Sequence, residues 1–263
     1  YQDKEPLELN KQSNYSSYIA VAVWHFYLLN NDIDFLQTYW EAVQKGISFS
    51  LTLQHSNGAI AWNIDENAKI DADYLLTGCS SIAKSLECAI AICQVLEHQQ
   101  YESEWRVSHL KLITALENPS EIFDLKKDRS KFSMDWYYPI LGGINSKQRI
   151  ASQMMKIKDS FWIRGLGIKC VSDEPWVTVA ETSECSIAYK KIGEDKIALE
   201  LLHNALAIVD AKGIPYMGWQ FHENIYWPEE TPSWTSAACI LAADANNQLT
   251  SAANLFIKKQ FKS

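Results

Sequence analysis

The sequence predicts an all-α protein, an α/α toroid in which helical hairpins surround a central cavity. Apolar residues recur at helical spacing along most of the 263 residues. Strand patterns are scarce, and only the segment from Phe161 to Val171 has the composition of a short strand. Two connecting loops also resemble each other, which is typical of a fold built from repeated units.

The helical segments fall into consecutive pairs whose turns or ends are marked by Asn, Gly or Pro. In the first helix Ile19, Val23, Phe26 and Tyr27 recur at helical spacing. The expected pairs cover residues 15–29 with 33–54, 77–97 with 102–117, 132–141 with 145–157, 175–192 with 195–209, and 232–246 with 249–261.

The two similar loops run from Gln54 to Trp62 and from Asp210 to Trp219. Each follows a long helix, turns at a glycine and then presents an aromatic residue. A single hairpin cannot bury its apolar face alone, so neighbouring hairpins are expected to pack around a shared axis. No linker or shift in composition divides the chain, so we expect one domain over residues 1–263.

The composition excludes several functions. The net charge is −8 and no basic run is longer than Lys126-Lys127, which argues against nucleic acids and anionic membrane surfaces. We expect no membrane-spanning segment, because no apolar stretch looks long enough. The six cysteines form no CxxC pair and suggest a reducing, cytoplasmic location. Neither a metal site nor a cofactor is predicted, so the expected partner is a small-molecule substrate.

Aromatic residues are unusually common, with ten Trp and twelve Tyr. Large aromatics line ligand pockets as well as cores, so their excess predicts a concave binding site. For any single residue the alternative is core packing. Several lie next to helix ends, and we expect the tryptophans to gather at one end of the cavity. The candidate substrate-binding residues are Trp62, Trp136, Tyr137, Tyr138, Trp176, Trp219, Trp227 and Trp234.

The strongest candidate catalytic pair is Glu181 with Glu184. They lie three positions apart and share a helix face with apolar Val177 and Ala188. Two neighbouring carboxylates repel each other, which raises the pKa of one of them, as in an acid/base pair. The alternative is that one of them caps a turn or forms an ion pair.

Two further acids complete the set of catalytic candidates. Glu230 follows Glu229 between Trp227 and Trp234, an arrangement suited to sugar recognition, although Glu230 could instead cap the next helix. Asp135 lies early in a helix, where capping is the alternative. We expect all four candidate acids to face the same cavity.

Three segments resemble bacterial prenyltransferase-like proteins of the terpenoid-cyclase and protein-prenyltransferase superfamily. They are residues 134–143, 170–182 and 227–235. That resemblance implies a toroid closed by six hairpins, so a chain with about five is one hairpin short at its start. Its chemical motifs are incomplete, because no Asp precedes a Cys by two positions and Asp71 with Asp73 supplies half of an acid motif.

A second resemblance is to six-hairpin glycosidases such as glucoamylases and trehalases. It rests on Asp34-Phe35-Leu36 with Trp40, Gln54 and Gly58, and on the segment 231–235 before an Ala-rich helix. It implies a toroid with carboxylates at the mouth of the ring.

Three functions therefore compete. The first is an enzyme that acts on a small glycoside or polyol-bearing substrate by general acid/base chemistry, which needs carboxylates flanked by Trp. The second is a terpenoid-cyclase or prenyltransferase-like enzyme acting on an isoprenoid, which needs an apolar aromatic pocket with one deep acid. The third is a non-catalytic small-molecule or glycan binding protein, which needs no pair of acids with shifted pKa values.

Overall fold

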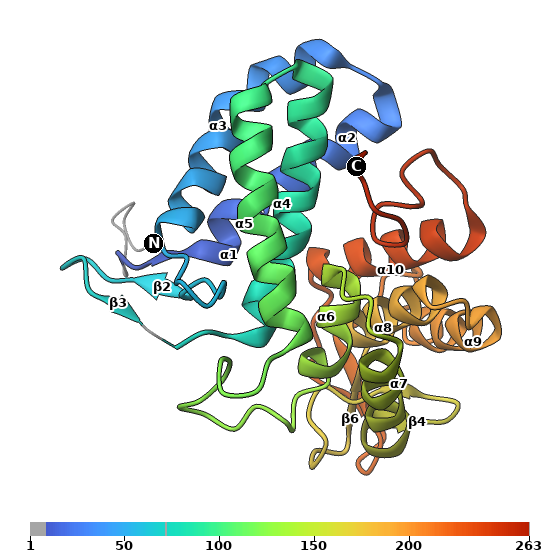
Figure 1. Cartoon of the computed structure of the whole chain (residues 1–263). Coiled ribbons are helices and arrows are strands. Elements are labelled where there is room, and N and C mark those ends of the chain that lie inside the picture. Colours follow the sequence, from blue (N-terminus) through green and yellow to red (C-terminus); the bar gives the residue numbers. More distant parts are fainter. Residues whose placement is uncertain (1–8, 72, 263) are drawn as a thin grey trace. The chain divides into compact units, whose positions relative to one another are not determined.

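The computed structural model describes residues 9–71 and 73–262, which are mainly helical as predicted (Figure 1). Contacts group them into two units. Unit 1 comprises the residues up to Lys127 together with the C-terminal segment from Gln260, and unit 2 is Asp128–Lys259. The single domain expected over residues 1–263 stays a prediction.

Unit 1 contains two helical hairpins, α2 with α3 and α4 with α5, close to the predicted ranges. Asp32 caps α3 by accepting a hydrogen bond from the Phe35 amide at 2.9 Å. The first expected helix is interrupted at Tyr18, so α1 precedes α2. The helices of unit 1 are α1 (Ser13–Ser17), α2 (Ile19–Asn30), α3 (Ile33–Thr52), α4 (Leu76–Leu96) and α5 (Gln99–Glu117).

Helix α4 is the buried centre of unit 1 and runs beside α5 (Figure 1). It also packs against α2 and α3. Contrary to our expectation, its length and composition would allow it to cross a membrane. However, 78% of its apolar window is buried inside the protein, and a core helix passes the same test.

A buried ion pair on α4 holds the C-terminal segment of unit 1. Lys84 Nζ lies 2.6 Å from Glu87 Oε1, with both side chains almost fully buried. The same Glu87 oxygen accepts a hydrogen bond from the Gln260 amide at 3.0 Å. The Gln260 side chain in turn accepts one from Trp24 Nε1 at 2.9 Å.

Unit 2 is organised around α8, which packs against α6, α9 and α10. The predicted helices of this unit are present up to Asn247, and a π-helical turn at Ile157–Phe161 follows α7. The helices of unit 2 are α6 (Met134–Gly142), α7 (Lys147–Lys156), α8 (Val179–Lys191), α9 (Asp195–Leu206) and α10 (Ser233–Asn247).

Short antiparallel strands join the helices. The strand expected between Phe161 and Val171 is confirmed as the β4–β5 hairpin. Among the described residues the strands form three small sheets: β1 (Lys11–Gln12), β2 (Asn63–Ile64) and β3 (Ile70–Asp71); β4 (Trp162–Ile163) and β5 (Gly167–Ile168); β6 (Trp176–Thr178), β7 (Gly218–Gln220) and β8 (Ile225–Tyr226).

Two helix predictions are corrected. The helix expected from residue 175 begins only at Val179, because the β-branched run Val177-Thr178 belongs to β6 and pairs with β7. The helix expected over 249–261 is a series of turns. There the Asp244 carboxylate accepts hydrogen bonds from the amide and hydroxyl of Thr250, at 2.7 and 2.6 Å. Such side-chain bonds compete with the helical ladder.

Candidate active site

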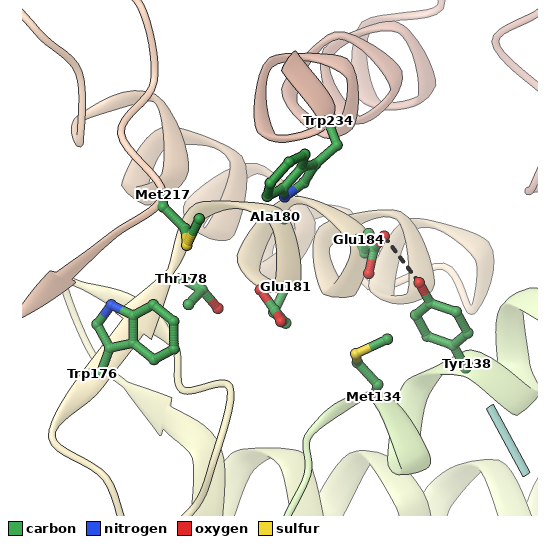
Figure 2. Close-up of a pocket in the computed structure, with 9 residues that line it drawn as sticks. All are labelled: Met134, Tyr138, Trp176, Thr178, Ala180, Glu181, Glu184, Met217 and Trp234. Carbon is green, nitrogen blue, oxygen red and sulfur yellow. Dashed lines mark hydrogen bonds between the residues drawn. The ribbon is translucent and has the colours of Figure 1, made fainter. Parts of the chain in front are cut away.

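A pocket of about 250 Å³ lies within unit 2. Figure 2 shows its walls, which come from α6, the β6–α8 junction, the segment before β7, and the first turn of α10. The lining residues are Met134, Tyr138, Trp176, Thr178, Ala180, Glu181, Glu184, Met217 and Trp234.

The start of α8 places both predicted glutamates in this pocket. Thr178 ends β6 and is the N-cap of α8, so Glu181 falls in the first helical turn. The free amide groups there favour negative charge. Glu184 follows three residues later and therefore shares the same helix face. Figure 2 shows Glu181 in the middle of the pocket, between Trp176 and Glu184.

Two tyrosines from α6 hold Glu184. The Tyr137 hydroxyl donates to Oε2 at 2.7 Å, and the Tyr138 hydroxyl donates to Oε1 at 3.1 Å. Burial in the protein, and then the charge on Glu181, raise the pKa of Glu184 to about 7, although the two tyrosine bonds oppose this. A large fraction of Glu184 therefore keeps its proton near neutral pH.

Cys170 lies beside Glu181. Burial raises the pKa of its thiol, and so do the charge of Glu181 and a hydrogen bond to that carboxylate. The cysteine therefore stays a neutral thiol that donates to Glu181, rather than a nucleophile. This contact could not be predicted from the sequence, because a lone cysteine in a loop has no distinguishing pattern.

The indole of Trp176 is fixed on one side of the pocket. Its Nε1–H donates to the Trp227 carbonyl at 2.6 Å, and the two rings meet edge to face with centroids 5.3 Å apart. Gly218 lies against this indole. A Cβ added at Gly218 would be 2.5 Å from Trp176 Nε1 and 2.4 Å from the Val177 carbonyl oxygen. Trp234 is 61% exposed and lines the pocket, so its ring is free to stack on a ligand.

The other candidate acids do not line this pocket. Asp135 is buried, and its Oδ2 lies 3.4 Å from Arg129 Nε in an ion pair that the sequence analysis did not consider for this residue. Glu230 is exposed in the loop before α10, and its backbone carbonyl accepts from the Met217 amide at 2.9 Å. The structure thus brings together Glu181 and Glu184, but not Asp135, while Glu230 supports the segment that carries Met217.

The remaining aromatic candidates are dispersed. Trp136 donates to the Ser130 carbonyl at 2.8 Å, outside the pocket lining. Trp219 packs against the core cluster that contains Val177 and meets Tyr226 edge to face. Trp62 belongs to unit 1, where its carbonyl accepts from the Ser13 amide.

Sequence reasoning also missed several lining residues, namely Met134, Met217, Thr178 and Ala180. Small and thioether side chains have no pattern that separates pocket walls from core. Within the described residues, no cluster of three or more His, Cys, Asp or Glu side chains has a metal-binding arrangement.

The chain is similar to one characterised glycosidase along almost its whole length. It is 36% identical over 249 residues to the MMP endo-(1,4)-3-O-methyl-alpha-D-mannosidase of Mycolicibacterium hassiacum, covering 95% of this chain and 68% of that protein. The chain belongs to the family of this mannosidase. Membership of the mannosidase family makes it a glycosidase-like enzyme, which agrees with the first of the three functions. No protein-family model matches the sequence.

Solved structures show the fold of this mannosidase-family chain. A sugar epimerase from a ruminal bacterium has a TM-score of 0.70 at 12% identity, covering 96% of this chain and 75% of its own. The rhamnosidase of Klebsiella oxytoca with rhamnose bound scores 0.64 at 11% identity, covering 90% and 47%. A D-mannose isomerase scores 0.63 at 12% identity, covering 95% and 75%.

These likenesses confirm the α/α toroid and the resemblance to six-hairpin glycosidases. The resemblance to prenyltransferase-like proteins gains no support from them.

Proposed function

We propose that this chain is a glycoside hydrolase that cleaves internal α-(1,4) bonds in a glycan of 3-O-methylated mannose, such as methylmannose polysaccharide. The observation that carries the proposal is the Glu181–Glu184 pair, held in one pocket with Trp176 and Trp234. The relative from Mycolicibacterium hassiacum, named for this bond and this sugar, supports the choice of substrate.

Hydrolysis of a glycoside needs one carboxyl group that gives a proton and one that takes a proton. With a pKa of about 7, Glu184 keeps a proton that it can donate to the glycosidic oxygen as the C1–O bond breaks. Glu181 then removes a proton from the water whose oxygen bonds to C1. After the reaction Glu184 is ionised and Glu181 is protonated, so one proton moves between them through solvent to restore the enzyme.

The aromatic walls supply binding. Sugar rings stack on exposed aromatic faces, and Trp234 offers such a face at the pocket edge. Trp176 offers a second face whose orientation is already fixed by Trp227, so little conformational entropy is lost when it binds.

Two substrates separate the roles of the glutamates. One is a 3-O-methylated α-(1,4)-mannan oligosaccharide, and the other is a 2,4-dinitrophenyl α-mannoside, whose leaving group needs no proton. Glu184→Gln should lose about 10²–10⁴-fold of its activity on the oligosaccharide and keep most activity on the dinitrophenyl substrate. Glu181→Gln should lose activity on both.

Glu200→Gln is the matched control, because it makes the same change on α9 of the same unit, outside the pocket. It should retain wild-type rates. Wild-type rates for Glu181→Gln and Glu184→Gln on the oligosaccharide would reject the proposed roles, and failure of the wild-type protein to cleave any α-mannoside would reject the function.

We also propose a cytoplasmic location. It is supported by the six cysteines, which are free thiols, five of them buried.

A further inference from the structure

We propose that the thioether side chains of Met134 and Met217 recognise an O-methyl group of the substrate, and that they make the pocket prefer methylated over unmethylated mannose. The inference rests on the proposed function, and it assigns the selectivity for the methyl ether to named residues.

The pocket walls combine a few polar residues with a larger apolar surface. The polar lining residues are Tyr138, Thr178, Glu181 and Glu184. The Tyr138 hydroxyl already donates to Glu184, and the Trp176 indole N–H already donates to the Trp227 carbonyl. The pocket therefore presents few free donors for sugar hydroxyls, whereas Met134, Met217 and Ala180 present apolar surface.

The two methionines lie on opposite sides of Glu181 (Figure 2). In Figure 2, Glu181 lies between Met217 and Met134, and both side chains extend toward the pocket. A sugar whose anomeric carbon is attacked beside Glu181 would bring its ring substituents against these thioethers. The selectivity would then act on the sugar ring at the cleaved bond.

Packing in the core does not account for these two methionines. The chain has four. Met154 on α7 is buried, with 7% exposure, and Met155 is 63% exposed. Met134 and Met217 are both half-buried and line the same pocket. A flexible, polarisable thioether at a pocket wall suits contact with a methyl group.

The physical basis of the preference is desolvation. A methyl ether has no hydrogen to donate, so it loses little when it packs against a thioether. A free hydroxyl at the same place loses its hydrogen bonds to water and finds no partner there. A single methyl group of the substrate, present or absent in an apolar pocket, changes kcat/KM by roughly 10–200-fold.

Thr178 offers the substrate a polar group, in contrast to the two methionines. Thr178 lines the pocket, and its hydroxyl oxygen is buried and has no hydrogen-bond partner within the described protein. A buried polar atom without a partner is costly unless a ligand or water satisfies it. We assign it to a ring hydroxyl that methylated and unmethylated mannose share.

The test compares kcat/KM for α-(1,4)-mannotetraose with and without 3-O-methyl groups. The wild-type enzyme should prefer the methylated form by roughly 10–200-fold. Met134→Gln and Met217→Gln should each reduce this ratio, and the double variant should bring it close to one. Met217→Leu, which keeps an apolar side chain, should retain the preference.

Two controls separate selectivity from damage to the pocket. Thr178→Val should lower kcat/KM for both substrates to the same extent and leave the ratio unchanged. Met155→Gln lies outside the pocket and should change neither rate nor ratio. Thermal melting of each variant verifies that it is folded.

An unchanged ratio in a folded Met134→Gln/Met217→Gln double variant would overturn the inference. Equal cleavage of both substrates by the wild-type enzyme would also overturn it while leaving the proposed function intact. If the wild-type enzyme cleaves neither, the proposed function fails, and the inference fails with it.

Discussion

The hydroxyl of Tyr137 lies 2.7 Å from Oε2 of Glu184, deep on the α6 side of the pocket. Burial, followed by the negative charge of Glu184, raises the pKa of Tyr137 well above its ordinary value. Tyr137 therefore remains a donor at any pH where the enzyme works. Its bond stabilises the ionised form of Glu184 and keeps the pKa of this acid from rising further.

Tyr137→Phe should raise the pKa of Glu184, because it removes a hydrogen bond that favours the ionised carboxylate. If Glu184 is the proton donor, the alkaline limb of the pH profile of kcat/KM should move to higher pH, by up to about one unit. Tyr138→Phe removes the longer bond and should move the limb in the same direction by less. A limb that stays in place, or moves toward acid, would contradict the assigned role of Glu184.

Glu184→Gln should stabilise the protein at alkaline pH. The pKa of Glu184 is raised from 4.5 to about 7 in the folded state, so the folded protein holds this proton more tightly than the unfolded chain. The free energy of unfolding of the wild-type protein therefore falls as pH rises from about 4.5 to 7. Above pH 7 the wild-type protein should therefore be less stable than the variant by about 3 kcal/mol. Thermal melts from pH 4 to pH 9 should show the variant and wild type converging in acid; a constant offset would argue against the shifted pKa.

Gly218→Ala should displace the Trp176 indole. The added Cβ would lie 2.5 Å from Trp176 Nε1 and 2.4 Å from the Val177 carbonyl, so backbone or ring must move. We expect a loss of about 1–3 kcal/mol in stability and a higher KM. Gly78→Ala is the matched control, since its Cβ would meet only Leu75 Cβ at 3.6 Å within α4, and it should be neutral or stabilising by up to about 1 kcal/mol. Equal effects of the two substitutions would show that Trp176 tolerates the methyl group.

Lys84→Met should destabilise unit 1 strongly, because it leaves the Glu87 carboxylate buried without this cation. Breaking such a pair costs roughly 3–5 kcal/mol. Lys45→Met breaks a pair with Glu41 in which the two side chains are 70% and 76% exposed, and it should leave stability nearly unchanged. Chemical denaturation of both variants measures the difference. Similar small losses would mean that Glu87 is neutralised by another route.

Helical periodicity was sufficient to predict the hairpins α2–α3, α4–α5, α6–α7 and α8–α9, because each has an apolar face and a turn residue at its end. It failed at β6, where three residues are too few to show a period, and at residues 249–261, where Thr250 and Asp244 bond to each other in place of the helical ladder.

The spacing of Glu181 and Glu184 predicted their shared face, because residues three positions apart on a helix are neighbours on its surface. The spacing could not show that Asp135 lies against Arg129, or that Glu230 supports Met217 only through its backbone. Such contacts depend on tertiary packing. Met134 and Met217 were missed for the same reason, because a thioether at a wall and one in a core occupy similar sequence contexts.

Glu87 meets its Gln260 partner across a sequence separation of 173 residues, with all of unit 2 between them. Unit 1 is therefore built from two separate stretches of the chain, and unit 2 is an insertion between them. During synthesis, residues 128–259 are all made before the segment that covers Glu87 exists. Until then α4 carries a buried carboxylate whose amide donor has not yet been made. A released chain that ends before Gln260 should accordingly leave unit 1 easier to digest with protease than unit 2.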